Sequence, residues 1–87
     1  MDRVLPIFKK LGITPSDSWT TLHILPGGKK DTCYYHTFKI KKMEYCVSAD
    51  SISVCFSSLK GMIYMGYDLN KLEKEIKKVI EKWIMFH

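Results

Sequence analysis

Lysine side chains gather on both sides of a tyrosine between residues 29 and 42. These lysines are Lys29, Lys30, Lys39, Lys41 and Lys42. The window contains one acidic residue, Asp31, and therefore carries +4 of the chain's net charge of +5. Because ammonium groups neutralise phosphates and an aromatic ring such as that of Tyr35 stacks on bases, the pattern predicts a strand that contacts nucleic acid. The alternative is an ordinary solvated strand whose lysines deter pairing with other chains.

The kind of basic residue limits this interpretation. Thirteen of the 14 basic residues are lysine and only Arg3 is arginine, the residue favoured for bidentate contacts with phosphates and bases. The lysine excess is thus weaker evidence for nucleic acid than the net charge alone. A small lysine-rich chain without catalytic motifs is typical of accessory proteins of phages and mobile elements. We therefore expect the partner to be nucleic acid or a nucleoprotein complex, and the role to be accessory or inhibitory.

Cysteine and histidine are the residues that would bind a metal. Cys33 and His36 have a ligand-like spacing, but their odd offset places them on opposite faces of a strand. Zinc sites usually combine two closely spaced pairs of ligands, and the chain offers one. We expect no metal, and we expect Cys33, Cys46 and Cys55 to pack as small apolar side chains. An odd number of cysteines fits reduced thiols in a cytoplasmic protein.

Motifs of catalysis are missing from the sequence. It contains no nucleophile elbow, no H-E-x-x-H, no phosphate-binding loop and no G-x-G-x-x-G. The acidic residues are scattered, without a carboxylate pair for acid–base chemistry. We therefore expect a protein that is not an enzyme and uses no cofactor. A Cys33 or Cys46 nucleophile with a histidine base stays open, because catalytic groups are assembled in space.

The end of the sequence is unusually apolar. Burial of Trp83 accounts for one of its large side chains. If Ile84, Met85 and Phe86 protrude, they would form an interface for a protein partner or a second copy. The alternative function is therefore a protein-interaction module or homodimer, acting as an adaptor or inhibitor through a sheet edge or this apolar end, without nucleic acid.

Length and composition bound the class of protein. The 87 residues are enough for a single domain spanning 1–87, and 46% of them are hydrophobic, as in ordinary globular domains. No run approaches 18 apolar residues, so we expect no membrane span. The first residues lack the apolar stretch of a secretory signal, which favours a cytoplasmic location.

Hydrophobic periodicity predicts the elements. Apolar residues at helical spacing favour a helix over residues 2–11, ended by Gly12, and a second helix from Asp68 or Asn70 to about Phe86. Alternating segments favour strands over 20–25 and 32–41, a hairpin over 44–56, and a last strand over 62–65. The order α-β-β-β-β(-β)-α predicts an α+β fold, an antiparallel meander of four or five strands with both helices on one face.

The alternation also predicts which side chains the helices cover. This set is Leu22, Ile24, Phe38, Ile40, Tyr45, Val47, Val54 and Phe56. The opposite face would carry cysteines, serines, Tyr35, Thr37, Lys39 and Lys41, and we expect it to meet solvent. In the 44–56 hairpin a loop at Asp50–Ser51 would set Cys46 opposite Cys55, whereas a loop at Ala49–Asp50 would keep the faces but not that pair.

Overall fold

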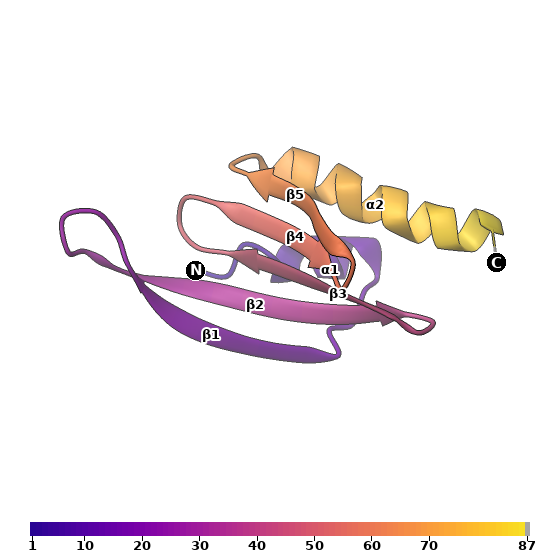
Figure 1. Cartoon of the computed structure of the whole chain (residues 1–87), viewed down its shortest axis with the longest axis horizontal. Coiled ribbons are helices and arrows are strands. Elements are labelled where there is room, and N and C mark those ends of the chain that lie inside the picture. The colour runs from indigo at the N-terminus through magenta and orange to yellow at the C-terminus, as the bar shows by residue number, and fades with distance from the viewer. Residues whose placement is uncertain (87) are drawn as a thin grey trace.

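The computed structural model describes the backbone of residues 1–86 and the side chains of residues 1–84. In this range two helices enclose five strands in the order α1 (Leu5–Leu11), β1 (Asp17–Ile24), β2 (Lys30–Ile40), β3 (Met43–Ala49), β4 (Val54–Ser58), β5 (Gly61–Gly66) and α2 (Leu69–Phe86). The strands form an antiparallel sheet in their sequence order, as Figure 1 shows. The predicted α+β meander is confirmed.

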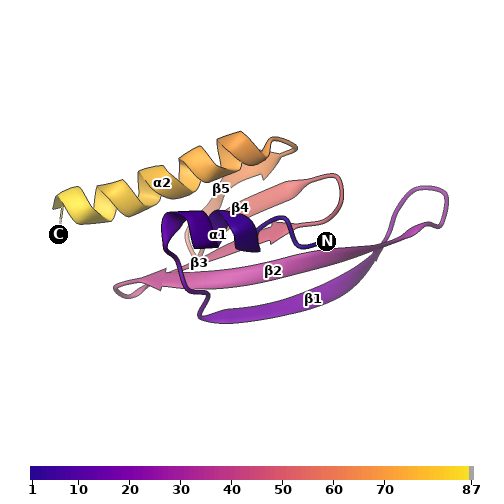
Figure 2. The ribbon, with the colours of Figure 1, turned by 180° about the vertical axis from the view of Figure 1, so that it is seen from behind.

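Both helices pack on one face of the sheet, the face turned toward the reader in Figure 2. Val4, Ile7 and Phe8, at the start of the chain, meet Leu72 and Ile76 of α2 in the core. The strands add Phe38, Tyr45, Val47, Ala49, Val54 and Phe56. The opposite face of the sheet has no helix over it in the described residues, and we call it the open face.

An aspartate precedes each helix. Asp2 Oδ1 accepts hydrogen bonds from the N–H groups of Val4 at 3.0 Å and Leu5 at 3.2 Å. Val4 is the N-cap of α1, so the helix starts later than the predicted residue 2. Asp68 Oδ1 accepts from Asn70 N–H at 2.8 Å and from Lys71 N–H at 3.3 Å. This selects Asp68 over Asn70 as the cap of α2.

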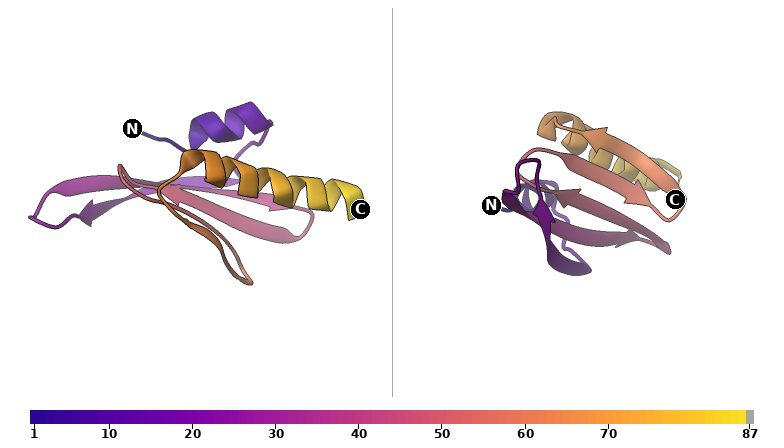
Figure 3. Two further views of the ribbon diagram at one scale, coloured as in Figure 1. Left: turned by 90° about the horizontal axis from the view of Figure 1, so that it is seen from above. Right: turned by 60° about the vertical axis from the view of Figure 1, so that its left-hand side comes forward.

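Two residues predicted to be covered by the helices are exposed. Leu22 and Ile24 lie on the helix-bearing side of β1, yet 61% of Leu22 and 74% of Ile24 is accessible. The hairpin of β1 and β2 extends past the ends of both helices, as the view from above in Figure 3 shows. The prediction was right about the face and wrong about burial, because strand alternation does not reveal how far a helix reaches along a strand.

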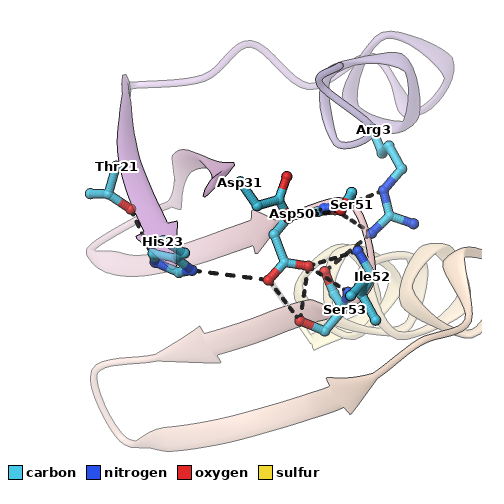
Figure 4. A network of polar contacts seen from close by, with 8 residues as sticks. All are labelled: Arg3, Thr21, His23, Asp31, Asp50, Ser51, Ile52 and Ser53. Atoms are coloured by element: carbon cyan, nitrogen blue, oxygen red, sulfur yellow. Dashed lines mark hydrogen bonds and ion pairs between the residues drawn. The ribbon is translucent and has the colours of Figure 1, made fainter. Parts of the chain in front are cut away.

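The β3–β4 hairpin adopts neither of the two predicted registers. Val47 pairs with Phe56, and Ser48, not Cys46, lies opposite Cys55. Four residues, 50–53, therefore connect the strands. Asp50 Oδ1 accepts hydrogen bonds from Ile52 N–H at 2.8 Å and from Ser53 N–H at 2.6 Å, a turn that the carboxylate closes (Figure 4). Relative to the register predicted from a loop at Asp50–Ser51, the pairing is shifted by two residues. Because the shift is even, each side chain kept its predicted face.

Arg3 fastens this loop to the beginning of the chain. Its Nε donates to the backbone oxygen of Asp50 at 2.9 Å, and its Nη2 donates to the same oxygen and to the oxygen of Ser53 at 3.2 Å. Because these carbonyls lie in a half-buried loop, the guanidinium satisfies acceptors that have limited access to water. The segment before α1 and the β3–β4 loop therefore form one unit.

Replacing Arg3 with Met should destabilise the protein by about 1.5–3 kcal/mol, the contribution of hydrogen bonds from a charged donor. Methionine keeps an apolar stem but cannot donate. Urea denaturation measures the free energy of unfolding, and Lys74→Met on the exposed side of α2 is the matched control, with a change within about 0.5 kcal/mol. Equal stability of the two variants would show that the Arg3 contacts contribute nothing.

Candidate functional site

The open face presents a row of side chains that crosses the sheet from edge to edge. The pairing sets Trp19 opposite Tyr35, Tyr35 opposite Ser48, Ser48 opposite Cys55, and Cys55 opposite Met65. Directly paired residues of antiparallel strands share a face. One row therefore runs from an aromatic pair at the β1 edge to a methionine at the β5 edge.

The aromatic pair is the most distinctive feature of this row. The rings of Trp19 and Tyr35 stack with centroids 5.2 Å apart and planes inclined by 3°. Trp19 remains 42% exposed at the outer strand. A hydrogen bond from Thr21 lowers the pKa of the Tyr35 phenol, but the hydrogen bond with Cys33 and burial outweigh it and the pKa is raised. The phenol is therefore neutral at physiological pH, and the pair offers an uncharged aromatic surface.

Sequence reasoning singled out Tyr35 but missed Trp19. The predicted strand began at Thr20, one residue after the tryptophan, whereas β1 begins at Asp17. The glycine-rich turn between the two strands could have indicated the pairing of Trp19, because the position of the turn sets the β1–β2 register. Gly27 and Gly28 both have positive φ, 89° and 81°, and Leu25 N–H donates to Lys29 O at 2.7 Å. Counting back from that turn sets Trp19 opposite Tyr35.

The predicted lysines form two groups rather than one patch. Lys29 lies in the β1–β2 turn and Lys30 begins β2. Lys41 and Lys42 form the turn after the other end of β2, and Lys41 has φ of 56°. The 11 residues of β2 separate the groups by about 35 Å at roughly 3.3 Å per residue.

Within the predicted window, Tyr35 and Lys39 share the open face. Lys39 Nζ lies 3.9 Å from Glu44 Oε2, a contact between exposed side chains that leaves the ammonium group in solvent. Lys30 pairs with Ile24 and so belongs to the helix-bearing side. The structure thus brings Tyr35 together with Trp19 and leaves the lysines at the two ends of the strand.

One carboxylate of the open face accepts hydrogen bonds from the β3–β4 loop. Asp31 Oδ2 accepts hydrogen bonds from Ser51 N–H at 2.9 Å and from the Ser51 hydroxyl at 2.8 Å. These bonds hold the pKa of Asp31 below its ordinary value. Asp31 therefore supports the loop shown in Figure 4, next to the Asp50 turn.

The cysteines all belong to the open face, but they differ in burial. Cys33 is buried, as expected of a small apolar side chain, and Thr37 is buried as well, which the prediction of a solvent-facing side did not anticipate. Burial raises the pKa of the Cys33, Cys46 and Cys55 thiols, so they stay protonated and are poor nucleophiles at neutral pH. The Cys55 thiol lies 3.3 Å from the Met62 sulfur. The burial and contacts of the three cysteines are those of side chains that pack in the sheet.

Metal ligands do not converge in the described residues. Cys33 and His36 lie on opposite faces of β2, as their spacing predicted. No group of three or more histidine, cysteine or acidic side chains is arranged to hold an ion in the part of the chain that the structure describes.

One hydroxyl–imidazole–carboxylate row resembles a catalytic relay. His36 Nδ1 lies 2.7 Å from the Ser18 hydroxyl, and His36 Nε2 lies 2.6 Å from Asp2 Oδ2. However, the imidazole is buried beside Phe8, with ring centroids 5.7 Å apart. Asp17 Oδ1 accepts the Ser18 N–H at 2.9 Å, so this N–H already has an acceptor and is not free to stabilise an oxyanion. The row is better suited to holding the N-terminal segment on the sheet.

A second row joins Thr21, His23 and Asp50. The Thr21 hydroxyl lies 3.2 Å from His23 Nε2, and His23 Nδ1 lies 4.0 Å from Asp50 Oδ2. The latter distance is too long for a hydrogen bond. In Figure 4 the Asp50 carboxylate is directed mainly to its own turn.

The predicted interface at the chain end is described in part. Ile84 is 73% exposed, whereas the side chains of Met85 and Phe86 lie outside the described residues. Trp83 is docked, since its Nε1 donates to the Tyr45 hydroxyl at 2.9 Å. Ile84 borders a groove of about 610 Å³ between the end of α1, β2 and α2. Its walls include Leu11, Ile13, Phe38, Ile40, Ile80 and Trp83, with Lys39 and Lys41 beside them.

Comparison with known proteins adds no assignment, since the chain matches no protein family, no curated protein and no solved structure. Neither helix of the described residues is both long and apolar enough to cross a membrane.

The Asp2–His36 contact should make stability sensitive to acid. Burial alone would raise the pKa of Asp2, but hydrogen bonds from His36, Leu5 and Val4 outweigh it and hold the pKa below the ordinary 3.8. The folded state then binds fewer protons than the unfolded state, so this contribution is present above about pH 4 and is lost as the pH falls further. Asp2→Asn should flatten the loss of melting temperature below pH 4.

The control for this experiment is Glu81→Gln, on the exposed side of α2. Thermal denaturation between pH 2 and 7 should give the wild-type slope for Glu81→Gln and a shallower one for Asp2→Asn. Identical slopes in all three proteins would contradict the role given to Asp2.

Proposed function

We propose that this protein is a non-enzymatic binding protein that holds single-stranded nucleic acid on its open face. The observation that carries the proposal is the stacked Trp19–Tyr35 pair on the side of the sheet without helices. The bases would meet these rings, and the phosphates would meet lysines at the ends of β2. The partner is either free nucleic acid or the single-stranded part of a nucleoprotein complex.

Aromatic side chains on an open sheet suit single strands. Unpaired bases can turn outward and stack on tryptophan or tyrosine, and every base has a face that can do so. Bases within a duplex are already stacked on each other. The Trp19 ring is partly exposed at the outer strand, and so it offers a surface on which a base can lie.

Charge supports contact with phosphates without sequence recognition. Lys39 lies on the same face as Tyr35, four residues along β2, or about 13 Å at 3.3 Å per residue. Lys41 and Lys42 follow in the exposed turn. Ammonium groups neutralise phosphates as point charges and lack the forked geometry with which arginine reads guanine. We therefore infer binding that tolerates many sequences.

Removing one ring should weaken binding of a short single-stranded oligonucleotide. Trp19→Ala and Tyr35→Ala should each reduce affinity by about 5- to 150-fold, since stacking on an aromatic side chain contributes roughly 1–3 kcal/mol per base. Fluorescence anisotropy with labelled DNA and RNA measures this change. Met65→Ala, in the same row at the other edge, is the control. A loss of affinity no greater than that of Met65→Ala would contradict the proposal.

Reversing the lysine charges should weaken binding and its dependence on salt. Changing Lys39, Lys41 and Lys42 to Glu should lower the logarithmic salt slope by about 2, because each phosphate contact on a single strand contributes roughly 0.7. The charge-matched control changes Lys71, Lys74 and Lys82 of α2 to Glu. If both triple variants lose affinity equally, the effect comes from total charge, and β2 is not the contact.

A protein partner in the apolar groove is the second candidate function. The exposed Ile84 beside the walls of Leu11, Ile13 and Ile80 favours it. Such a complex would form through apolar burial and would depend little on salt. A nucleoprotein target could use both surfaces.

The two candidates respond to different substitutions. Ile84→Ser adds no charge beside Lys39 and Lys41, so it should leave oligonucleotide affinity unchanged under the first proposal and should weaken capture of a protein partner under the second. Loss of oligonucleotide binding by Ile84→Ser, with the fold retained by circular dichroism, would move the nucleic-acid site to the groove.

A further inference from the structure

The outer strand β1 is a long sheet edge without protection. It has eight residues, and its register with β2 runs unbroken from the Asp17–Thr37 pair to the Ile24–Lys30 pair. Seven of the eight residues are exposed, and His23 is half-buried. In Figure 1 no helix or strand of the described chain lies beyond β1.

Natural proteins usually guard such edges. Lysine or proline in the strand, a bulge, a short length or a covering loop all prevent pairing with another chain. β1 has no lysine, arginine, proline or glycine. The opposite edge, β5, is shorter, runs between Gly61 and Gly66 and has an irregularity opposite Phe56 and Ser57. The contrast identifies β1 as the edge open to pairing.

We propose that β1 pairs antiparallel with β1 of a second copy of this chain, joining the two sheets into one. This inference does not rest on nucleic-acid binding. The strand itself favours a second copy as its partner. When two β1 strands pair antiparallel in a register that the backbone permits, side chains of opposite character lie opposite each other.

The backbone decides which registers are permitted. Leu25 N–H donates to Lys29 O, and hydrogen-bonded pairs recur at every second residue of an antiparallel ladder. The odd-numbered residues of β1 therefore direct their N–H and C=O groups to β2, and the even-numbered residues direct theirs to the free edge. In a β1–β1 pair the even-numbered residues must bond to each other, and the Ser18 N–H, which donates to Asp17 Oδ1 within the single chain, would exchange this acceptor for one of the second copy. Helices of both copies then lie on the same side of the joined sheet.

Side chains select one register among these. With Thr20 opposite Thr20 of the second copy, Asp17 lies opposite His23 of the second copy, and Trp19 lies opposite its Thr21. The first pair combines an acid with an imidazole, and it forms twice because of the two-fold symmetry. A shift that centres the pairing on Thr21 loses both Asp–His pairs. No lysine of β1 opposes this approach, although each chain carries +5.

This register also joins the two open faces. Trp19 and Trp19 of the second copy become diagonal neighbours, with Cα atoms about 7–8 Å apart. Since each tryptophan stacks on its own Tyr35, four aromatic rings would follow one another across the centre of the dimer. A dimer would thus offer a longer aromatic surface than a single chain.

Sedimentation velocity of the whole chain tests the pairing from micromolar to near-millimolar concentration, because short strand interfaces are weak. The wild type should shift from the 10.2 kDa monomer to twice that mass. Leu22→Lys places a lysine on the β1 edge and should keep the protein monomeric throughout. Met65→Lys makes the same kind of change at an exposed residue of β5 and should leave the dimer intact.

A second variant distinguishes loss of the dimer from loss of the fold. Thr20→Pro removes an N–H that faces the free edge and no bond to β2, so it should abolish the dimer while circular dichroism stays unchanged. Amide exchange by NMR should show Thr20 and Leu22 gaining protection as concentration rises, while Trp19 and Thr21 are protected throughout. A wild type that stays monomeric at every concentration, or a dimer that survives Leu22→Lys and Thr20→Pro, would overturn the proposal.

Discussion

The contact of Arg3 with the β3–β4 loop connects the beginning of the chain to the centre of the sheet. The guanidinium donates to the carbonyls of Asp50 and Ser53, and the neighbouring Asp2 reaches His36 on β2. These two adjacent side chains attach the short segment that precedes α1 to the β3–β4 loop and to β2. Val4, Ile7 and Phe8 are thereby held over the sheet, where they complete the core with Leu72 and Ile76.

Because both helices cover the same face of the sheet, the two faces have different roles. The helix-bearing face contains the core and supplies the stability of a small domain, which has little apolar surface to spare. The open face is free of that requirement, and it can present a partly exposed tryptophan. The same arrangement leaves β1 with a neighbour on one side only, because the meander follows the sequence order and the outermost strand is the first.

Periodicity predicted those parts of the fold that depend on nearest neighbours. The stripe containing Leu72 and Ile76 predicted α2, and alternation predicted the face of every core strand residue except Ala49. Features that depend on distant contacts escaped it. The register of β3 and β4 depends on the Asp50 turn and on Arg3, 47 residues away. The exposure of Leu22 and Ile24 depends on where the helices end, which no pattern within β1 records.

The same distinction between local pattern and distant contact applies to the candidate site. Tyr35 was recognised from its place among lysines, whereas its partner Trp19 lies at the start of another strand and becomes a neighbour only through the β1–β2 register. The lysines were predicted to form one patch, but the length of β2 separates them into two groups at the ends of the strand.

The most direct measurement of the central proposal uses the two tryptophans of the chain, one on each candidate surface. Their indole N–H signals can be followed separately by ¹⁵N–¹H NMR while a short single-stranded oligonucleotide is added at low salt. Binding at the open face predicts a saturable shift of the Trp19 signal with little change at Trp83, which borders the groove. A shift of Trp83 with Trp19 unchanged, or no shift of either signal, would contradict it.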